Sequence, residues 1–155
     1  MGQSQDTKTP DPIEFLILDH RAVDRLFTQF DEAKEEQSRQ RIIREAVAAV
    51  AVHAAIEEEI FYPAARALIA DKQLIDTAIE EHAEVKRVMD NLAETHDAPA
   101  RSEKFLALAR LVKERVKEEE TQLFPKLDAK RADFSDLGAQ LRRRKEELRR
   151  VSLFL

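Results

Sequence analysis

Glycine is almost absent from this chain, which has two glycines and five prolines among its 155 residues. A chain with so few turn-forming residues favours long, uninterrupted elements over the many tight turns that a sheet protein needs. Hydrophobic residues make up 43% of the chain and charged residues 37%, which is the balance that amphipathic helices require for a core and a solvated exterior. The composition therefore predicts an all-helical fold.

Capping and helix-breaking residues divide the chain into helical stretches. We predict helices from Asp11-Pro12 to about Glu36, Ser38 to about Ala70, Gln73 to about His96, Ser102 to about Ala129, and a shorter arginine-rich helix after Asp133-Phe134-Ser135. Asp11 should cap the first helix and Ser38 the second. Pro63 and Pro125 lie inside helical patterns, where each should kink the helix or end its regularity.

Short connections between four long helices predict an all-α fold, an up-down-up-down four-helix bundle with an additional short C-terminal helix. Residues 1–10 are expected to form a flexible leader, and residues 11–130 the bundle. Residues 131–155 are expected to form a C-terminal helix that packs on the bundle or on a partner. An oligomer is left open.

Charge and composition argue against several classes of partner. A net charge of −5 disfavours nucleic acid and anionic membranes, which reward a cationic face. The sequence has neither a signal peptide pattern nor an apolar run of the roughly 18 residues that a membrane span requires. It has no cysteine, which excludes thiolate ligands and disulfides. We therefore expect a cytoplasmic protein without a nucleic-acid or membrane partner.

A segment of the sequence occurs twice. Residues 53–63, HAAIEEEIFYP, recur as residues 115–125, RVKEEETQLFP. Positions i and i+4 share one face of a helix, so His53 and Glu57 direct an imidazole and a carboxylate toward the same point. In the second copy Arg115 replaces the histidine, and its guanidinium stays protonated and cannot bind a cation. The repeat predicts a metal-binding or acid/base pair that is complete in one copy only.

Polar residues lie on the apolar stripes of all four long helices. His20, His53 and His82 fall on such stripes, and Arg115 holds the same kind of position on the fourth helix. The stripe of His82 includes Ile79. Buried polar groups are costly unless they are paired or bind a metal. A single histidine on such a stripe is usually a hydrogen-bonded core residue. Three together, on facing helices, predict a shared interior metal site.

The expected ligands define the class of metal. Glu57 and Glu119 add two inward carboxylates to the histidines, and a mixed set of nitrogen and oxygen atoms suits iron, manganese or zinc better than calcium or magnesium. Most of the remaining acidic residues near the motifs are expected to be solvated or salt-bridged at the surface; they are Glu58, Glu59, Glu118 and Glu120. Glu81 is expected to be an exposed charge, with a supporting role beside His82 as the alternative. No separate catalytic base or nucleophile is identified.

Four separated motifs carry a resemblance to a known family: Asp19-His20, His53-x-x-x-Glu57 with Phe61-Tyr62-Pro63, Glu81-His82, and Glu118-Glu119 with Leu123-Phe124-Pro125. Together they resemble a hemerythrin-like, or HHE cation-binding, domain over nearly the whole chain. The resemblance implies a four-helix bundle with a non-haem di-iron centre. It implies terminal histidine ligands and bridging carboxylates, and the implied metal ligands are His20, His53, Glu57, His82 and Glu119.

The sequence departs from the family pattern at two positions. Arg115 stands where the resemblance implies a ligand histidine, and Lys86 stands where hemerythrins place a second histidine on the third helix. Because the charges lie close together, we favour the hypothesis that Arg115 replaces the second iron and pairs with Glu57 and Glu119, which would leave a mononuclear site or none. The other hypothesis is that its side chain swings aside, so that water or Glu118 completes a weakened second site. One or two irons per chain are therefore expected, with zinc or manganese as alternatives.

Three functions follow from these expectations. The leading hypothesis is a non-haem iron-binding protein that senses or handles iron or oxygen. The first alternative is a peroxide-decomposing di-iron enzyme, because peroxide chemistry tolerates an open coordination position. The second is a metal-free structural bundle in which Arg115 forms a buried ion-pair network. Dioxygen, peroxide and nitric oxide are the small-molecule partners that the resemblance implies.

Overall fold

The computed structural model describes residues 9–152, and all of its regular elements there are helical. The α-helices are α1 (Pro12–Glu32), α2 (Glu36–Ile56), α3 (Tyr62–Leu68), α4 (Lys72–Ala93), α5 (Ala98–Glu118), α6 (Phe124–Leu127) and α7 (Leu137–Ser152). Two π-helical turns, η2 (Glu57–Phe61) and η3 (Glu119–Leu123), and a 3-10 helix, η4 (Asp128–Phe134), complete the fold. Residues 1–8 of the expected leader and residues 153–155 of the expected C-terminal segment lie outside the described residues.

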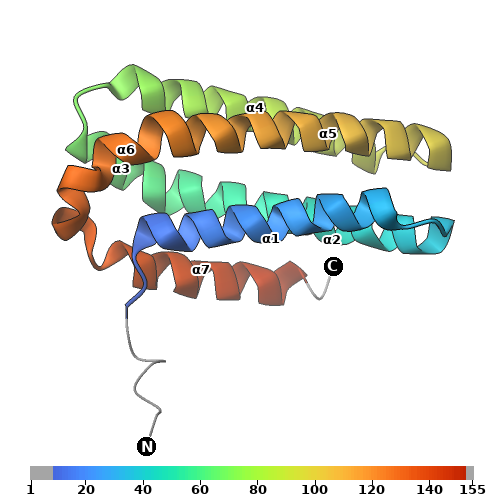
Figure 1. The fold of residues 1–155 in the computed structure, drawn as a ribbon, viewed down its shortest axis with the longest axis horizontal. Helices are drawn as coiled ribbons and strands as arrows, with labels where there is room; N and C mark the ends of the chain where they lie inside the picture. Colours follow the sequence, from blue (N-terminus) through green and yellow to red (C-terminus); the bar gives the residue numbers. More distant parts are fainter. Residues whose placement is uncertain (1–8, 153–155) are drawn as a thin grey trace, which may run out of the picture.

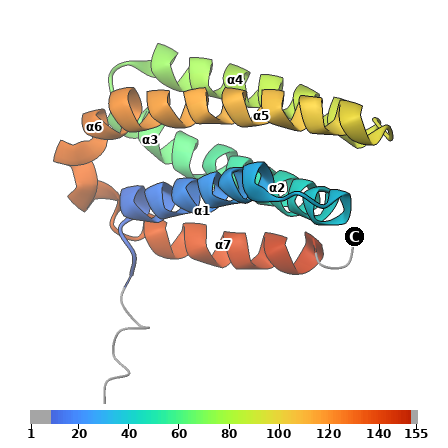
Figure 2. The same ribbon diagram turned by 45° about the vertical axis from the view of Figure 1, so that its right-hand side comes forward.

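Four long helices lie lengthwise along one another (Figure 1). Helix α1 packs on α2 and α4 packs on α5, because each pair is joined by a connection of only a few residues. Helix α7 runs along the outer side of the α1–α2 pair, as both views show (Figure 2). The all-helical prediction is confirmed. Within residues 9–152, no helix combines the length and apolar composition needed to span a bilayer.

Aspartate caps begin three of the long helices. Asp11, Asp71 and Asp97 each accept a hydrogen bond from a backbone N–H three residues later, which satisfies a donor that the first helical turn leaves free. The predicted Asp11 cap is therefore confirmed, whereas the predicted Ser38 cap is wrong. Helix α2 begins two residues earlier, after Glu35, whose carbonyl already accepts the Arg39 N–H at 3.0 Å.

Several predicted helix ends also need correction. Helix α1 ends at Glu32 and α4 ends at Ala93, each three or four residues earlier than expected. Helix α5 begins at Ala98 rather than near Ser102, because Asp97 caps it and a proline fits its first turn. The predicted fourth helix is interrupted after Glu118 by a π-helical turn and ends in a 3-10 helix.

Pro63 and Pro125 each follow a π-helical turn. Proline has no N–H to donate to the carbonyl four residues earlier, so the preceding turn is free to widen. In the first copy the Tyr62 N–H bonds to the carbonyl of Glu57, five residues back. In the second copy the Phe124 N–H bonds in the same way to Glu119. The predicted loss of regularity is confirmed, and the repeated segment proves to be a repeated structure.

A polar layer separates two apolar clusters in the interior. The first cluster contains Leu16, Ile56, Ile75, Leu123 and their neighbours at the end of the bundle near α3 and α6. The second contains Val23, Val50, Val85, Val112 and their neighbours toward the other end. His20, His53, His82 and Glu119 fall between these positions in sequence. These four polar residues therefore lie at one depth in the bundle.

One member of the predicted stripes is not buried. The side chain of Ile79 is 41% exposed, whereas Ile75, Val85 and Leu92 of the same helix are buried. Helix α4 lies at the edge of the bundle, so its buried face is narrow, and Ile79 lies beside that face. The assignment of Ile79 to the inward stripe of His82 was therefore wrong.

Candidate metal centre

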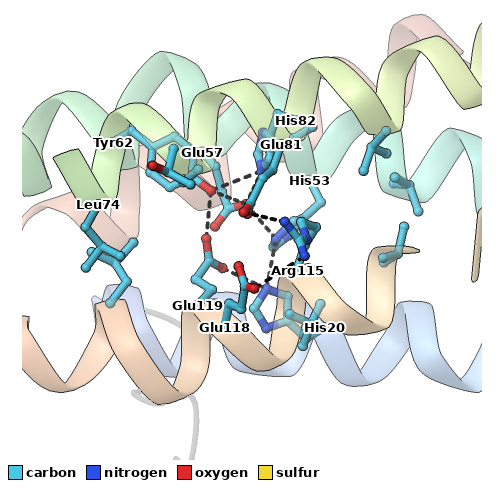
Figure 3. Close-up of a pocket in the computed structure, with 18 residues that line it drawn as sticks. His20, His53, Glu57, Tyr62, Leu74, Glu81, His82, Arg115, Glu118 and Glu119 are labelled. Carbon is cyan, nitrogen blue, oxygen red and sulfur yellow. Dashed lines mark hydrogen bonds and ion pairs between the residues drawn. The ribbon is translucent and has the colours of Figure 1, made fainter. Parts of the chain in front are cut away.

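Two histidines and two glutamates converge inside the bundle (Figure 3). They are His20 from α1, His53 from α2, Glu57 from η2 and Glu119 from η3. One potential ligand atom from each lies within 4.8 Å of the others. His20, Glu57 and Glu119 are buried, and His53 is nearly so. The residues that the sequence placed on three of the predicted helices thus form one compact cluster.

The spacing of the donor atoms fits a small cation. Nε2 of His20 lies 3.0 Å from Nε2 of His53 and 3.0 Å from Oε1 of Glu119. Nε2 of His53 lies 3.1 Å from Oε1 of Glu57. Donors bound about 2.1 Å from one tetrahedral ion are roughly 3.4 Å apart, which is close to these values. Imidazole nitrogens with carboxylate oxygens form a donor set typical of first-row transition metals.

The second oxygen of Glu57 supports the same interpretation. Oε2 of Glu57 is buried and has no hydrogen-bond partner among the residues that the structure describes. A buried oxygen without a partner loses its hydration and gains nothing in return, which costs about 1–3 kcal/mol or more for a charged group. A bound cation would satisfy this oxygen. The residues present therefore fit the metal that their chemistry suggests.

The two π-helical turns position the carboxylates. Glu57 and Glu119 are the first residues of η2 and η3, and the backbone carbonyl of each accepts the hydrogen bond that closes its π-helical turn. A π turn adds one residue to the helical repeat and therefore changes the direction in which the side chains before and after it point. The carboxylates face the cluster, while the residues after the turns pack in the first apolar cluster.

His20 and His53 are each held from behind by an acid. Nδ1 of His20 lies 2.7 Å from Oε2 of Glu120, and Nδ1 of His53 lies 2.6 Å from Oδ2 of Asp19. A proton on Nδ1 leaves the lone pair of Nε2 directed at the cluster, which is the usual support of a metal-binding histidine. Glu120 was expected at the surface, so this role corrects the sequence interpretation.

Each supporting acid is itself paired with a cation. Arg21 donates to both oxygens of Glu120, at 2.7 and 3.1 Å. Lys145 of α7 forms an ion pair with Asp19. Burial alone would raise the pKa of Asp19, but the bonds from His53 and Lys145 bring that pKa below its ordinary value. Sequence reasoning identified neither cation, because neither lies near the repeated segment.

His82 lies beside the cluster with weaker support. Its Nε2 is 3.2 Å from Oε1 of Glu57 and 3.0 Å from the hydroxyl of Tyr62. Its Nδ1 is buried and has no hydrogen-bond partner within residues 9–152, since the carboxylate of Glu58 is 3.6 Å away. The structure therefore places His82 next to Glu57 without the acid that fixes the other two histidines.

Tyr62 is a site residue that sequence reasoning missed. Its hydroxyl donates to Oε2 of Glu119 at 2.8 Å and lies 3.4 Å from Oε1 of Glu57. Burial, with the nearby charges of Glu119 and Glu57, raises the pKa of this phenol well above its ordinary value. The repeated segment contained a signal for this role. Tyr62 is the one tyrosine of the sequence, and the second copy has Phe124, which lacks a hydroxyl, at the same position.

Glu57 and Glu119 are buried carboxylates whose charges repel each other. Burial and the charge of Glu57 raise the pKa of Glu119 to about 7. Burial opposes ionisation of Glu57 as well, but the His53 charge and hydrogen bonds to Glu57 bring its pKa well below the ordinary value. Burial likewise opposes a charge on His53, yet Glu57 and Asp19 raise the His53 pKa well above its ordinary value. In the absence of a metal, Glu119 therefore gains or loses its proton near neutral pH.

Arg115 does not pair with the central carboxylates, which corrects one hypothesis from the sequence. Its guanidinium forms an ion pair with Glu81 of α4 and lies 3.4 Å from Glu118. Glu57 and Glu119 are already bonded to the histidines and Tyr62, whereas Glu81 faces α5 and needs a partner. The side chain of Glu81 is 19% exposed, so the expectation of a surface charge was also wrong.

A cavity adjoins the cluster. Its volume is about 80 Å³, and its lining includes His82, Tyr62, Glu81, Arg115 and the four clustered residues. Figure 3 shows Tyr62 and Leu74 to the left of the clustered residues, with Arg115 near Glu81 on their other side. A water molecule needs about 10–15 Å³ of such space, so the cavity has room for several water-sized molecules.

A helical bundle with an interior cluster of histidines and carboxylates defines a class of cation-binding protein. The family model described as the Hemerythrin HHE cation binding domain matches residues 11–127, and this chain belongs to that family. A DNA nickase from Nostoc sp. (strain PCC 7120) is 27% identical over 123 residues. The match covers 79% of this chain and 35% of the nickase, so the chain spans about a third of that relative's length. No solved structure matches the chain.

Proposed function

We propose that this protein binds non-haem iron at a centre formed by His20, His53, Glu57 and Glu119, and that it senses or handles iron or oxygen. The observation that carries the proposal is the convergence of the four potential ligand atoms to within 4.8 Å. The buried, unpaired oxygen of Glu57 supports it independently. The up-down-up-down order that the sequence predicts for the four long helices is part of the same proposal.

The centre is proposed to be asymmetric, with one strong metal position and one weak one. His20 and His53 each have a supporting acid at 2.6–2.7 Å, which favours a strong position between them. His82 has no such support, and Arg115 stands at the position of the remaining family histidine. A second ion would therefore rely on His82 and on the shared carboxylates Glu57 and Glu119.

Iron, when bound, would supply one-electron chemistry and an open position for a small ligand. The cavity of about 80 Å³ has room for a small ligand such as dioxygen, peroxide or nitric oxide. The hydroxyl of Tyr62 holds a proton 2.8 Å from Glu119 at this cavity. Zinc and manganese suit the same donors, so the metal is to be determined by measurement.

Peroxide decomposition is the competing function, because it tolerates an open metal position. We do not extend DNA nicking to this chain: the shared segment covers 35% of the nickase, and the net charge of −5 disfavours DNA. The two remaining functions are separated by measuring oxygen evolution from hydrogen peroxide after iron loading. Turnover far above that of free iron would favour the enzyme, and turnover at that level favours sensing or handling.

The first test is metal per chain, measured by elemental mass spectrometry on the purified protein and again after anaerobic ferrous loading and desalting. We expect one tightly held iron per chain. A His53→Ala variant should lose it, whereas His96→Ala, an exposed histidine beyond the end of α4, should keep it. Protein that retains no metal after loading would overturn the proposal.

A further inference from the structure

Helix α7 lies outside residues 11–127, the part of the chain that the family model matches, yet it reaches the metal centre. It runs along α1 and α2, the helices that carry His20 and His53 (Figures 1 and 2). The side chain of Lys145, on this helix, is 26% exposed and points inward to the buried Asp19. An element beyond the family domain thus contacts the group that supports a proposed ligand.

The position of α7 is set by close packing. Leu137 and Leu141 are buried in the first apolar cluster. Gly138 lies directly against the backbone of Pro10, so that a Cβ at position 138 would stand 1.7 Å from the Pro10 carbonyl oxygen. Arg144 adds an ion pair with Glu59, at 2.7 Å. These contacts fix where Lys145 meets the bundle.

The contact between Lys145 and Asp19 extends to the centre through His53. One carboxylate oxygen of Asp19, Oδ1, pairs with Lys145, and the other, Oδ2, accepts a hydrogen bond from Nδ1 of His53 at 2.6 Å. With both oxygens engaged, the carboxylate of Asp19 is held against rotation. The imidazole of His53 is then fixed with Nε2 toward Glu57, at 3.1 Å.

The corresponding arrangement behind His20 is built differently. There the supporting acid is Glu120, and its cation is Arg21, the residue next to His20 on α1. Arg21 is 50% exposed and belongs to the bundle itself. The cation paired with Asp19, behind His53, instead comes from a helix that follows the bundle in sequence, 126 residues beyond Asp19. The orientation of His53 therefore depends on the docking of α7.

We propose that Lys145 is a positioning residue for the metal centre, and that it couples metal affinity to the docking of α7 on the bundle. This inference rests on the proposed function, because it requires a metal at His53. Loss of Lys145 frees one oxygen of Asp19 and loosens the orientation of His53. Because coupling between two equilibria is reciprocal, metal binding also stabilises the docked position of α7.

The experiment compares Lys145→Met, Lys145→Arg and the control Arg144→Met. Arg144→Met removes an ion pair between α7 and Glu59, and among the described residues Arg144 makes no bond to an acid that supports a histidine. Affinity is measured by chelator competition with Fe²⁺ and Co²⁺, and the visible absorption of bound Co²⁺ reports the ligand geometry. Circular dichroism and thermal melting of the metal-free proteins establish that each variant is folded.

We expect Lys145→Met to lose about tenfold in metal affinity and to change the Co²⁺ spectrum, the lower end of the effect of altering a group that supports a ligand. Lys145→Arg should retain the wild-type spectrum. Arg144→Met should match wild type in both readouts, because the ion pair of Arg144 with Glu59 is solvent-exposed and contributes little to the docking of α7. Hydrogen exchange should show metal-dependent protection of α7 in wild type and less of it in Lys145→Met. If Lys145→Met does not fold, Lys145→Gln replaces it with the same expectations.

Two results would overturn the inference. One is wild-type affinity and spectrum in folded Lys145→Met, and the other is an equal loss in Arg144→Met, which would mean that α7 acts through general stability. Wild-type protein that binds no metal would instead refute the proposed function on which the inference rests. Failure of the Lys145 inference is therefore seen in the variants, whereas failure of the proposed function is seen in the wild-type protein.

Discussion

Arg115 forms its ion pair with Glu81, on the neighbouring helix α4. The arginine that replaces a family histidine thus has a partner of its own, and the central carboxylates remain available to a cation. Its buried Nε has no hydrogen-bond partner among the described residues. Under the proposed function, the arginine would remove a ligand without taking the place of the metal.

Arg115→His should raise the iron content from about one toward two per chain, because an imidazole at this position lies one turn before Glu119 and shares its helix face. Metal per chain after ferrous loading is the measurement. Arg110→His, on the exposed side of the same helix, is the control and should leave the content unchanged. Unchanged iron in Arg115→His would show that position 115 does not limit the second position.

Glu57→Gln should abolish the stabilisation of the protein by metal. A ligand at 100 times its dissociation constant stabilises the folded state by about 2.7 kcal/mol, which raises the melting temperature of a chain of this size by roughly 5–10 °C. The neutral amide should remove most of that rise in a calorimetric scan with and without Fe²⁺. Glu58→Gln, at an exposed neighbouring position, should keep it. Equal shifts in both variants would exclude Glu57 as a ligand.

The metal-free protein should lose stability as the pH rises from about 5 to 8. The folded state raises the pKa of Glu119 from 4.5 to about 7, so it retains a proton that the unfolded chain has released. The folded state binds more protons in this interval, and the free energy of unfolding falls by up to roughly 3 kcal/mol at 1.36 kcal/mol per pKa unit. His53, whose pKa is also raised, acts in the same direction above its ordinary value of 6.5.

Urea unfolding of metal-free protein at several pH values measures this dependence. Glu119→Gln should flatten the curve between pH 5 and 7, because the amide does not titrate. Glu103→Gln, at an exposed position on α5, should leave the curve as in wild type. Stability that is constant or increases over this interval in wild type would contradict the assigned proton.

Tyr62→Phe should retain the metal but weaken the fold. The substitution removes the hydroxyl that donates to Glu119 at 2.8 Å and leaves a buried oxygen with one partner fewer. The expected loss in the free energy of unfolding is about 1–3 kcal/mol for the metal-free protein. Denaturant unfolding and iron content, measured on the same sample, test both parts. Loss of iron would instead place Tyr62 among the residues that hold the metal.

The sequence predicted the fold better than the connections between its polar groups. Helical periodicity identified the inward positions of His20, His53 and His82, because an amphipathic helix must turn one face to the core. Periodicity says which face a residue occupies but not which neighbour a long side chain reaches. The pairing of Arg115 with Glu81 therefore had to come from the structure.

The residues that support the centre were missed for a related reason. Glu120 and Glu119 are adjacent in the sequence, yet one faces the cluster and the other reaches behind His20. The widened π turn begins at this point, and an ordinary helical repeat does not describe its side-chain directions. Lys145 could not be found either, because the register of α7 depends on its contact through Gly138.

The polar layer between the two apolar clusters has a consequence for the cooperativity of the bundle. Each long helix crosses the layer, and the apolar contacts of the first cluster end there before those of the second begin. Concerted unfolding of the two ends therefore depends on the bonds within the layer. A cation held by three or four helices would make the halves unfold as one unit, so metal supply would decide whether the protein behaves as a single folding unit or as two.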